Sequence, residues 1–118
     1  MAQYLLSVWL VDGDEPPTQQ IMEQMYADVD AFNTDLQAAG AWIFAGGLLP
    51  KESAVVVAAD GSDVSVTEGV LVTGPESLGG FWIIEVGDDQ AARQWAGLAS
   101  QACRAPVEVR PFESIPDA

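Results

Sequence analysis

The stretch YLLSVWLV at residues 4–11 is the part of the chain that best predicts the fold. It is short, rich in aromatic and branched residues, and bounded by Asp12 and Gly13, as is typical of a β-strand. A strand that faces water on one side alternates apolar and polar residues. This one is apolar on both sides, with one set on each face: Tyr4, Leu6, Val8 and Leu10, and Leu5, Trp9 and Val11. Both faces of the predicted strand therefore require a cover.

The next segment, residues 18–39, predicts an amphipathic helix. Thr18 is a suitable N-cap, and Gly40 follows the segment where a left-handed residue is wanted. Apolar residues recur every three or four positions, which is the spacing of one helix face. This stripe consists of Ile21, Met25, Val29, Phe32 and Leu36.

The remaining segments complete an α+β pattern. Strands are predicted at 41–46, 53–59, 64–67, 79–86 and 105–110. A second helix is expected after Asp88 and Asp89, which offer an N-cap and an acid for its first turn. With the hairpin at 53–67 set aside, the order is βαββαβ, that of a ferredoxin-like fold with an inserted β-hairpin. We expect one domain over residues 1–112 and a flexible C-terminal tail at 113–118.

The strands also predict a homodimer. Segments 41–46 and 79–86 are apolar on both faces, whereas 105–110 is mixed and reads as an edge strand. Both helices of a ferredoxin-like unit cover the same sheet face, so the second face needs another cover. A second copy, stacked sheet on sheet with two-fold symmetry, gives a dimeric α/β barrel-like assembly. The alternative is a monomer in which the hairpin folds back over the open face.

Charge and composition exclude several classes of partner. The chain has 18 acidic and 4 basic residues, a net charge of −14, and no Lys or Arg in residues 1–50. Nucleic acid and anionic membranes would be repelled, so neither is expected as a partner. The acids either solvate the surface or steer a cationic ligand. No apolar run approaches the ~20 residues of a membrane helix, and the first residues do not resemble a secretory signal, so a cytoplasmic location is expected.

The missing residue types limit the chemistry. The chain has no histidine and a single cysteine, Cys103. Serine–histidine or cysteine–histidine catalysis is therefore absent from this chain, as are the ligands that zinc and copper prefer. We expect no cofactor and no transition metal; only a hard cation on carboxylates remains open.

Five residues are candidates for a ligand-binding site: Asn33, Glu68, Glu76, Trp82 and Arg110. Asn33 lies among apolar helix neighbours and either offers a hydrogen bond to a pocket or faces solvent. Glu68 and Glu76 bracket a loop at 68–78 that could act as a lid, or they are surface charges. Arg110 could anchor an anion or form a surface ion pair. Trp82 is expected to line a pocket or to join an aromatic dimer core, as are the other strand tryptophans. The glycines at 69, 74, 79 and 80 are read as turn residues.

Several short motifs resemble the YCII-related superfamily, and in particular the branch named for its DGPF motif. The resemblance covers nearly the whole chain in conserved order and spacing. It is carried by Phe32-Asn33, Leu36, Gly40, Gly47-Leu48, Pro50, VTEG at 66–69, LGGF at 78–81, Glu85-Val86, Trp95-Ala96 and VEVRP at 107–111.

The resemblance implies a dimeric ferredoxin-like fold with a pocket near the dimer interface, but no defined reaction. The DGPF motif is degenerate, since Glu68-Gly69-Val70-Leu71 stands in its place, and Thr73 and Pro75 replace charged residues. The YCII branch proper carries a histidine proposed to pair with an aspartate. The matching helix position, near Val29, is apolar here, so that pair is not carried over.

Two hypotheses of function follow. The first is an enzyme-like binder of a small organic ligand, recognised by an apolar pocket that holds Asn33, a loop acid and a tryptophan. The alternative is a non-catalytic interaction module or a partner subunit of another protein, recognised by an absent or filled pocket. Whether the chain is an enzyme is left open by the sequence.

Overall fold

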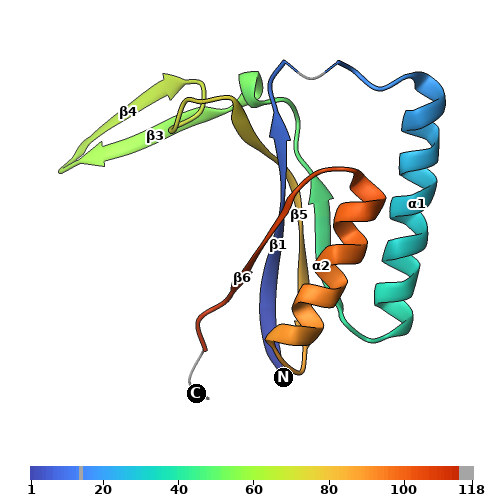
Figure 1. Cartoon of the computed structure of the whole chain (residues 1–118). Coiled ribbons are helices and arrows are strands. Elements are labelled where there is room, and N and C mark those ends of the chain that lie inside the picture. Colours follow the sequence, from blue (N-terminus) through green and yellow to red (C-terminus); the bar gives the residue numbers. More distant parts are fainter. Residues whose placement is uncertain (14, 115–118) are drawn as a thin grey trace.

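The computed structural model describes residues 1–13 and 15–114 and gives an α+β arrangement (Figure 1). The two α-helices are α1 (Gln19–Ala38) and α2 (Asp89–Cys103), and a short 3-10 helix, η1, spans Lys51–Ser53. The strands are β1 (Ala2–Val11), β2 (Trp42–Gly47), β3 (Val55–Asp60), β4 (Asp63–Glu68), β5 (Glu76–Val86) and β6 (Val107–Pro111).

Four strands form one antiparallel sheet in the order β2-β5-β1-β6. Both helices lie on the same face of this sheet (Figure 1). The arrangement is compatible with the predicted ferredoxin-like fold, and β6 occupies the predicted edge. The hairpin β3-β4 forms a separate two-stranded sheet. Within the described residues, neither helix is both long and apolar enough to cross a bilayer.

The helix ends follow from local sequence. Thr18 Oγ1 accepts a hydrogen bond from the Ile21 amide at 3.2 Å, and Asp88 Oδ1 accepts one from the Ala91 amide at 2.8 Å. These are the two predicted N-caps, and each satisfies an amide that has no partner within its helix. Gly40 has φ +73°, the left-handed conformation expected just after α1.

The predicted start of the 79–86 strand was wrong. Strand β5 begins at Glu76 rather than at Gly79, so only residues 69–75 form the connection that precedes it. The glycines at 79 and 80 therefore lie inside a strand and not in a turn. Residues 113 and 114 of the predicted tail have no regular secondary structure, and 115–118 lie outside the described residues.

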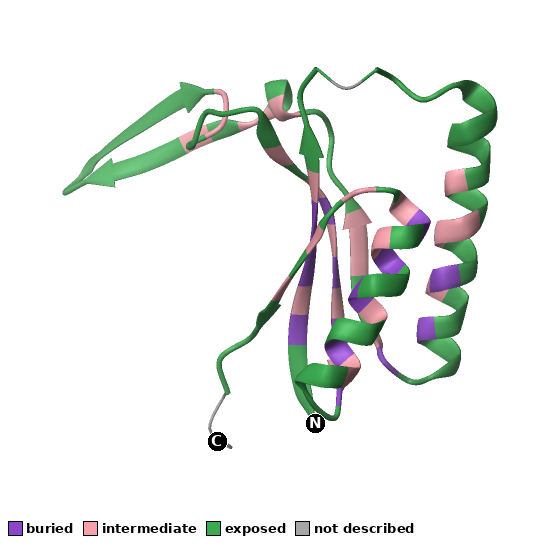
Figure 2. Cartoon of the chain, in the orientation of Figure 1, coloured by how far each residue is buried: buried purple, intermediate pink, exposed green. Residues whose placement is uncertain are grey.

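The core lies between the sheet and the helices (Figure 2). Phe32 of α1 sits between two indoles, with ring centroids 5.1 Å from Trp82 and 5.9 Å from Trp95, both edge to face. Such pairs add to the stabilisation from buried area. Burial of the α1 stripe is partial: Phe32 and Leu36 are buried, whereas Ile21 is 45% exposed. The first half of α1 is therefore packed against the sheet much less closely than the second half.

The second face of the sheet carries no helix, and the hairpin does not cover it. In Figure 1 the hairpin projects away from the sheet on the side opposite the helices. The alternative prediction that the hairpin folds back over this face is therefore wrong. Phe44, which pairs with Ile83 on this open face, remains 53% exposed and lies 6.0 Å from Phe81 by ring centroids.

Candidate ligand-binding site

A cavity of about 530 Å³ lies between the middle of α1 and the sheet. This volume is within the range of pockets for small organic molecules. Residues from β1, α1, β2 and β5 line it together with Leu48 and Cys103. The lining residues that carry a ring or a long apolar side chain on this side of the sheet are Leu10, Met25, Tyr26, Trp42, Leu48 and Trp82.

Glycines on neighbouring strands explain why the space is not filled. Gly47 of β2 pairs with Gly80 of β5, and both line the cavity. Gly80 alternates with the buried residues Trp82, Ile84 and Val86, so both glycines belong to the helix-covered face of the sheet. A side chain at either position would project toward α1. With none there, the floor of the cavity is bare backbone.

The two glycines differ in what surrounds them. A Cβ added at Gly80 would lie 2.9 Å from the carbonyl oxygen of Gly46, so this position is closed by the neighbouring strand. A Cβ added at Gly47 would meet nothing within 4 Å. Gly47 therefore opens onto free space, whereas Gly80 permits the close approach of β2.

Asn33 and Trp82 are joined across the cavity wall. The Trp82 indole Nε1–H donates to Asn33 Oδ1 at 2.8 Å, linking β5 to α1. An indole N–H can only donate, so this bond assigns the oxygen and the nitrogen of the Asn33 amide. Among the described residues no protein group accepts from the Asn33 Nδ2 amino group, which leaves two donors at the cavity wall.

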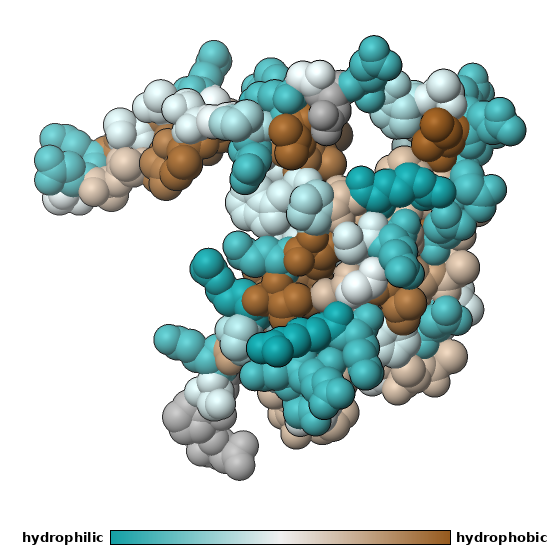
Figure 3. Space-filling model, viewed as in Figure 1, coloured by the Kyte–Doolittle hydropathy of each residue, from teal (hydrophilic) through white to brown (hydrophobic). Residues whose placement is uncertain are grey.

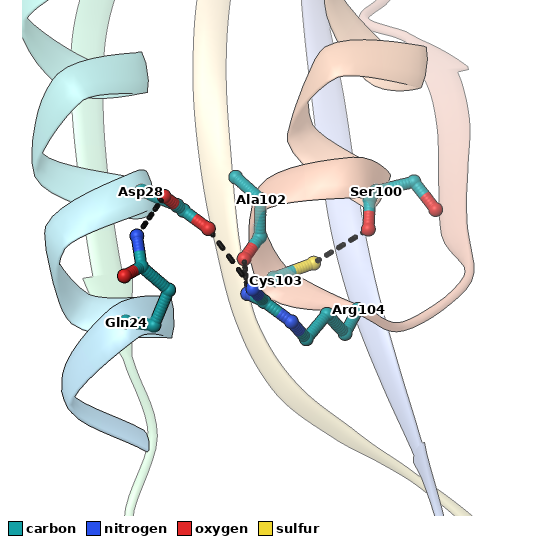
Figure 4. A network of polar contacts seen from close by, with 6 residues as sticks. All are labelled: Gln24, Asp28, Ser100, Ala102, Cys103 and Arg104. Carbon is teal, nitrogen blue, oxygen red and sulfur yellow. Dashed lines mark hydrogen bonds and ion pairs between the residues drawn. The ribbon is translucent and has the colours of Figure 1, made fainter. Parts of the chain in front are cut away.

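Cys103 contributes a thiol to the lining where α2 ends. Burial raises its pKa above the ordinary value of 9.0, so the thiol is neutral near pH 7. Its Sγ lies 4.0 Å from the carbonyl oxygen of Ser100 (Figure 4). The sulfur therefore presents a small, weakly polar surface to the cavity.

A polar network beside Cys103 ties the two helices together (Figure 4). Arg104, in the left-handed conformation with φ 55°, donates to Asp28 Oδ2 at 3.1 Å. Gln24 donates to Asp28 Oδ1 at 2.9 Å. The Gln24 hydrogen bond and, after it, Arg104 lower the pKa of Asp28. These contacts fix the end of α2 against α1 close to the cavity.

The charged side chains lie elsewhere. The residues that line the cavity include no Asp, Glu, Lys or Arg. The Cys103 thiol, whose pKa is raised by burial, adds no charge to the lining near pH 7. In a chain with net charge −14, this is a local exception, and it suits an uncharged occupant.

The structure brings together two of the five predicted site residues. Asn33 and Trp82 meet at the cavity, and Trp42 joins them. Glu68 ends β4 and Glu76 begins β5; both are exposed and neither lines the cavity. Arg110 lies on β6, with Nη2 3.8 Å from Glu108 Oε1, which is the surface ion pair foreseen as its alternative role.

Sequence reasoning missed the other determinants of the cavity. The pairs Gly46-Gly47 and Gly79-Gly80 are a usable signal, because two glycine pairs on strands that become neighbours remove side chains from one place. Met25 and Tyr26 could be placed on α1 but not at a cavity wall. Within the described residues, no group of three or more His, Cys, Asp and Glu could hold a metal ion.

The fold and the cavity define an α+β domain with a ligand-sized, uncharged space between its first helix and its sheet. Residues 7–113 match the model of the YCII-related domain, and the chain belongs to this family. No curated protein matches the chain. The assignment to the DGPF branch stays a prediction.

Proposed function

We propose that the chain binds a small, uncharged organic molecule in the cavity between α1 and the sheet. The observation that carries this proposal is the hydrogen bond between Trp82 and Asn33, which holds an amide at the wall of an otherwise apolar space. Binding sites for small molecules commonly combine apolar walls with a few oriented polar groups.

The amide orientation gives the chemical class of the ligand. Its oxygen is taken by the indole of Trp82, so its amino group is the part that a ligand meets. A carbonyl oxygen or an unprotonated ring nitrogen would accept from it. The indoles of Trp42 and Trp82 favour a flat, ring-containing body. An anion would find no cationic side chain in the lining.

The alternative function, an interaction module without a ligand, predicts an absent or filled pocket. The open space above Gly47 supports the binder instead. The apolar pocket foreseen for a binder holds Asn33 and a tryptophan, but no acid from the 68–78 loop.

We further propose that the chain is a homodimer built through the open sheet face, as a dimeric α/β barrel-like assembly. Leu5, Phe81 and Ile83 are only half-buried there, and Phe44 is exposed. Burial of these apolar side chains against a second protomer would favour association.

Fluorescence titration with prodan tests the ligand proposal. Prodan (6-propionyl-2-dimethylaminonaphthalene) is a neutral, two-ring ketone, and its emission shifts when it leaves water. Wild type should bind it with saturable blue-shifted emission. Asn33→Asp keeps an acceptor for Trp82 and removes the two donors. It should weaken binding about ten-fold, the loss expected for one hydrogen bond of ~1.4 kcal/mol.

A second dye and a second variant complete the test. The anionic dye 1-anilinonaphthalene-8-sulfonate should bind at least ten-fold more weakly than prodan. Glu68→Gln/Glu76→Gln should bind prodan as wild type does, because neither acid lines the cavity. Equal prodan affinity for wild type and Asn33→Asp would show that the amide does not recognise the ligand.

A further inference from the structure

The hairpin β3-β4 is an arm with one exposed apolar side. Cross-strand pairs put its valines on the same side, since Val57 faces Val66 and Ala59 faces Val64. The exposed fractions of Val55, Val57, Val64 and Val66 are 57%, 61%, 63% and 65%. A two-stranded hairpin is marginal in water unless its apolar side is covered.

Contacts hold the base of this arm in place, although no other described part of the chain covers its apolar side. Lys51 of η1 forms an ion pair with Asp12, which follows β1. The Gly69 amide donates to the Ala54 carbonyl oxygen at 2.8 Å and closes the base of the hairpin. These contacts set the direction in which the arm leaves the sheet. The molecule is accordingly extended: its radius of gyration is 16.6 Å, against about 13.5 Å for a compact chain of this length.

The arm and the open sheet face form two sides of a concave corner. Figure 1 shows the arm projecting from one end of the sheet on the side without helices. In Figure 3 hydrophobic atoms gather along the side of the arm that faces this corner. The apolar side of the arm and the open face therefore point toward the same space.

We infer that the arm clasps a second copy of this chain, with its valine side lying against the partner subunit. This inference rests on the proposed homodimer and extends it from the sheet face to the hairpin. The lengths agree with it. Six residues of strand span about 20 Å, and stacked sheets lie about 10 Å apart. The arm is thus long enough to pass the partner's sheet and reach its next layer.

Area also favours an arm that takes part in the interface. Each edge strand pairs with its neighbour over five residues, which gives the sheet face a length of roughly 17 Å. Four strands side by side give it a width of roughly 19 Å, so its projected area is about 320 Å². Standard interfaces bury about 800 Å² per partner. The two strands of the arm add roughly 200 Å² in projection, which enlarges the contact by more than half.

Charge distribution points to the same partner. The valine side of the arm carries one ionisable group, Glu68, at its base, while Asp60 and Asp63 form the pair at its tip on the other side. A basic protein partner would be drawn to the acidic surfaces and gain nothing from this side. A second copy presents an open face that is apolar at Leu5, Phe44, Phe81 and Ile83. The charged residues on that face are Glu85 of β5 and the ion pair of Glu108 and Arg110 on the edge strand β6, so the valine side meets apolar residues there without bringing many like charges together.

A pair of matched double variants tests the clasp. Val57→Lys/Val66→Lys places two charges on the valine side, at residues that face each other. Ala58→Lys/Ser65→Lys places the same two charges on the opposite side, also at facing and exposed residues. Sedimentation equilibrium over a concentration series gives the dimer dissociation constant, and far-ultraviolet circular dichroism checks the fold of each variant.

Wild type should sediment at twice the chain mass of 12.5 kDa. Val57→Lys/Val66→Lys should raise the dissociation constant at least 100-fold, whereas Ala58→Lys/Ser65→Lys should change it less than five-fold. A wild-type monomer would overturn the dimer itself. A wild-type dimer that both double variants leave intact, or weaken equally, would overturn the clasp and leave the sheet-face dimer standing. Should the valine-side variant lose its fold, Val57→Thr/Val66→Thr replaces it, with an expected rise of at least ten-fold.

Discussion

The indole N–H of Trp82 donates to the side-chain oxygen of Asn33 at 2.8 Å, and this bond joins the central strand β5 to the helix α1. This bond lies at the boundary between the buried core and the cavity. Phe32, the preceding residue, packs edge to face on the same indole in the buried core. Asn33 itself borders the cavity. One turn of α1 thus contributes Phe32 to the core and Asn33 to the cavity wall.

Replacing Asn33 by leucine should destabilise the fold. The Trp82 indole is buried, and its N–H would lose its acceptor, at a cost of about 1–3 kcal/mol. Urea unfolding followed by tryptophan fluorescence measures the change. Asn33→Asp keeps an acceptor and should lose less than half as much. Equal stability of wild type and Asn33→Leu would show that this bond does not stabilise the fold.

Two alanine substitutions in the paired glycines should differ sharply. Gly80→Ala forces a methyl group to 2.9 Å from the Gly46 carbonyl oxygen, and such overpacking costs about 1–3 kcal/mol. Gly47→Ala meets nothing within 4 Å and should be neutral or slightly stabilising. Thermal and urea unfolding of both variants provide the measurement. A Gly47→Ala protein as unstable as Gly80→Ala would contradict the assignment of the cavity floor.

The folded structure should slow the alkylation of Cys103. Burial raises the pKa of this thiol, so its reaction with iodoacetamide should be slower in the folded than in the urea-unfolded protein at pH 8. The pKa of the Cys103 thiol is higher in the folded than in the unfolded protein. The folding stability linked to the protonated thiol is therefore fully present below the ordinary pKa of 9.0 and is lost as pH rises through the raised pKa.

Urea unfolding at pH 8 and pH 10 tests this stability linkage. Wild type should lose more stability over that interval than Cys103→Ala, which lacks the group. Prodan, held against Cys103 in the cavity, should also slow alkylation at pH 8. Alkylation of the folded protein as fast as that of the unfolded protein would contradict the burial of this thiol.

The sequence predicted the fold well because its signals are local. Thr18 and Asp88 cap the two helices, as their residue types at the starts of the two helical segments predicted. The mixed pattern of 105–110 identified an edge strand. The direction of the β3-β4 hairpin could not be predicted, because its alternating valines are compatible both with folding back over the sheet and with projecting from it. The direction is set by contacts at its root, including the ion pair of Lys51 with Asp12, which sequence spacing does not reveal.

The site was predicted only in part, for a related reason. Asn33 stands out on a helix because a polar amide among apolar neighbours is conspicuous. The glycines at 79 and 80 were read as turn residues, since glycine usually marks turns. Their meaning depends on the register that places Gly47 opposite Gly80. An empty space between elements is a property of that pairing and not of any segment alone.

Prodan titration of Gly47→Leu is the most direct test that the cavity is the binding site. A leucine at this position projects into the open space above the sheet, since an added Cβ meets nothing within 4 Å. Gly97→Leu adds the same side chain on α2, also into open space but outside the cavity, and serves as the control. We predict that Gly47→Leu stays folded and loses at least ten-fold in prodan affinity, while Gly97→Leu binds as wild type does. A folded Gly47→Leu protein with wild-type affinity would contradict the assignment of ligand binding to this cavity.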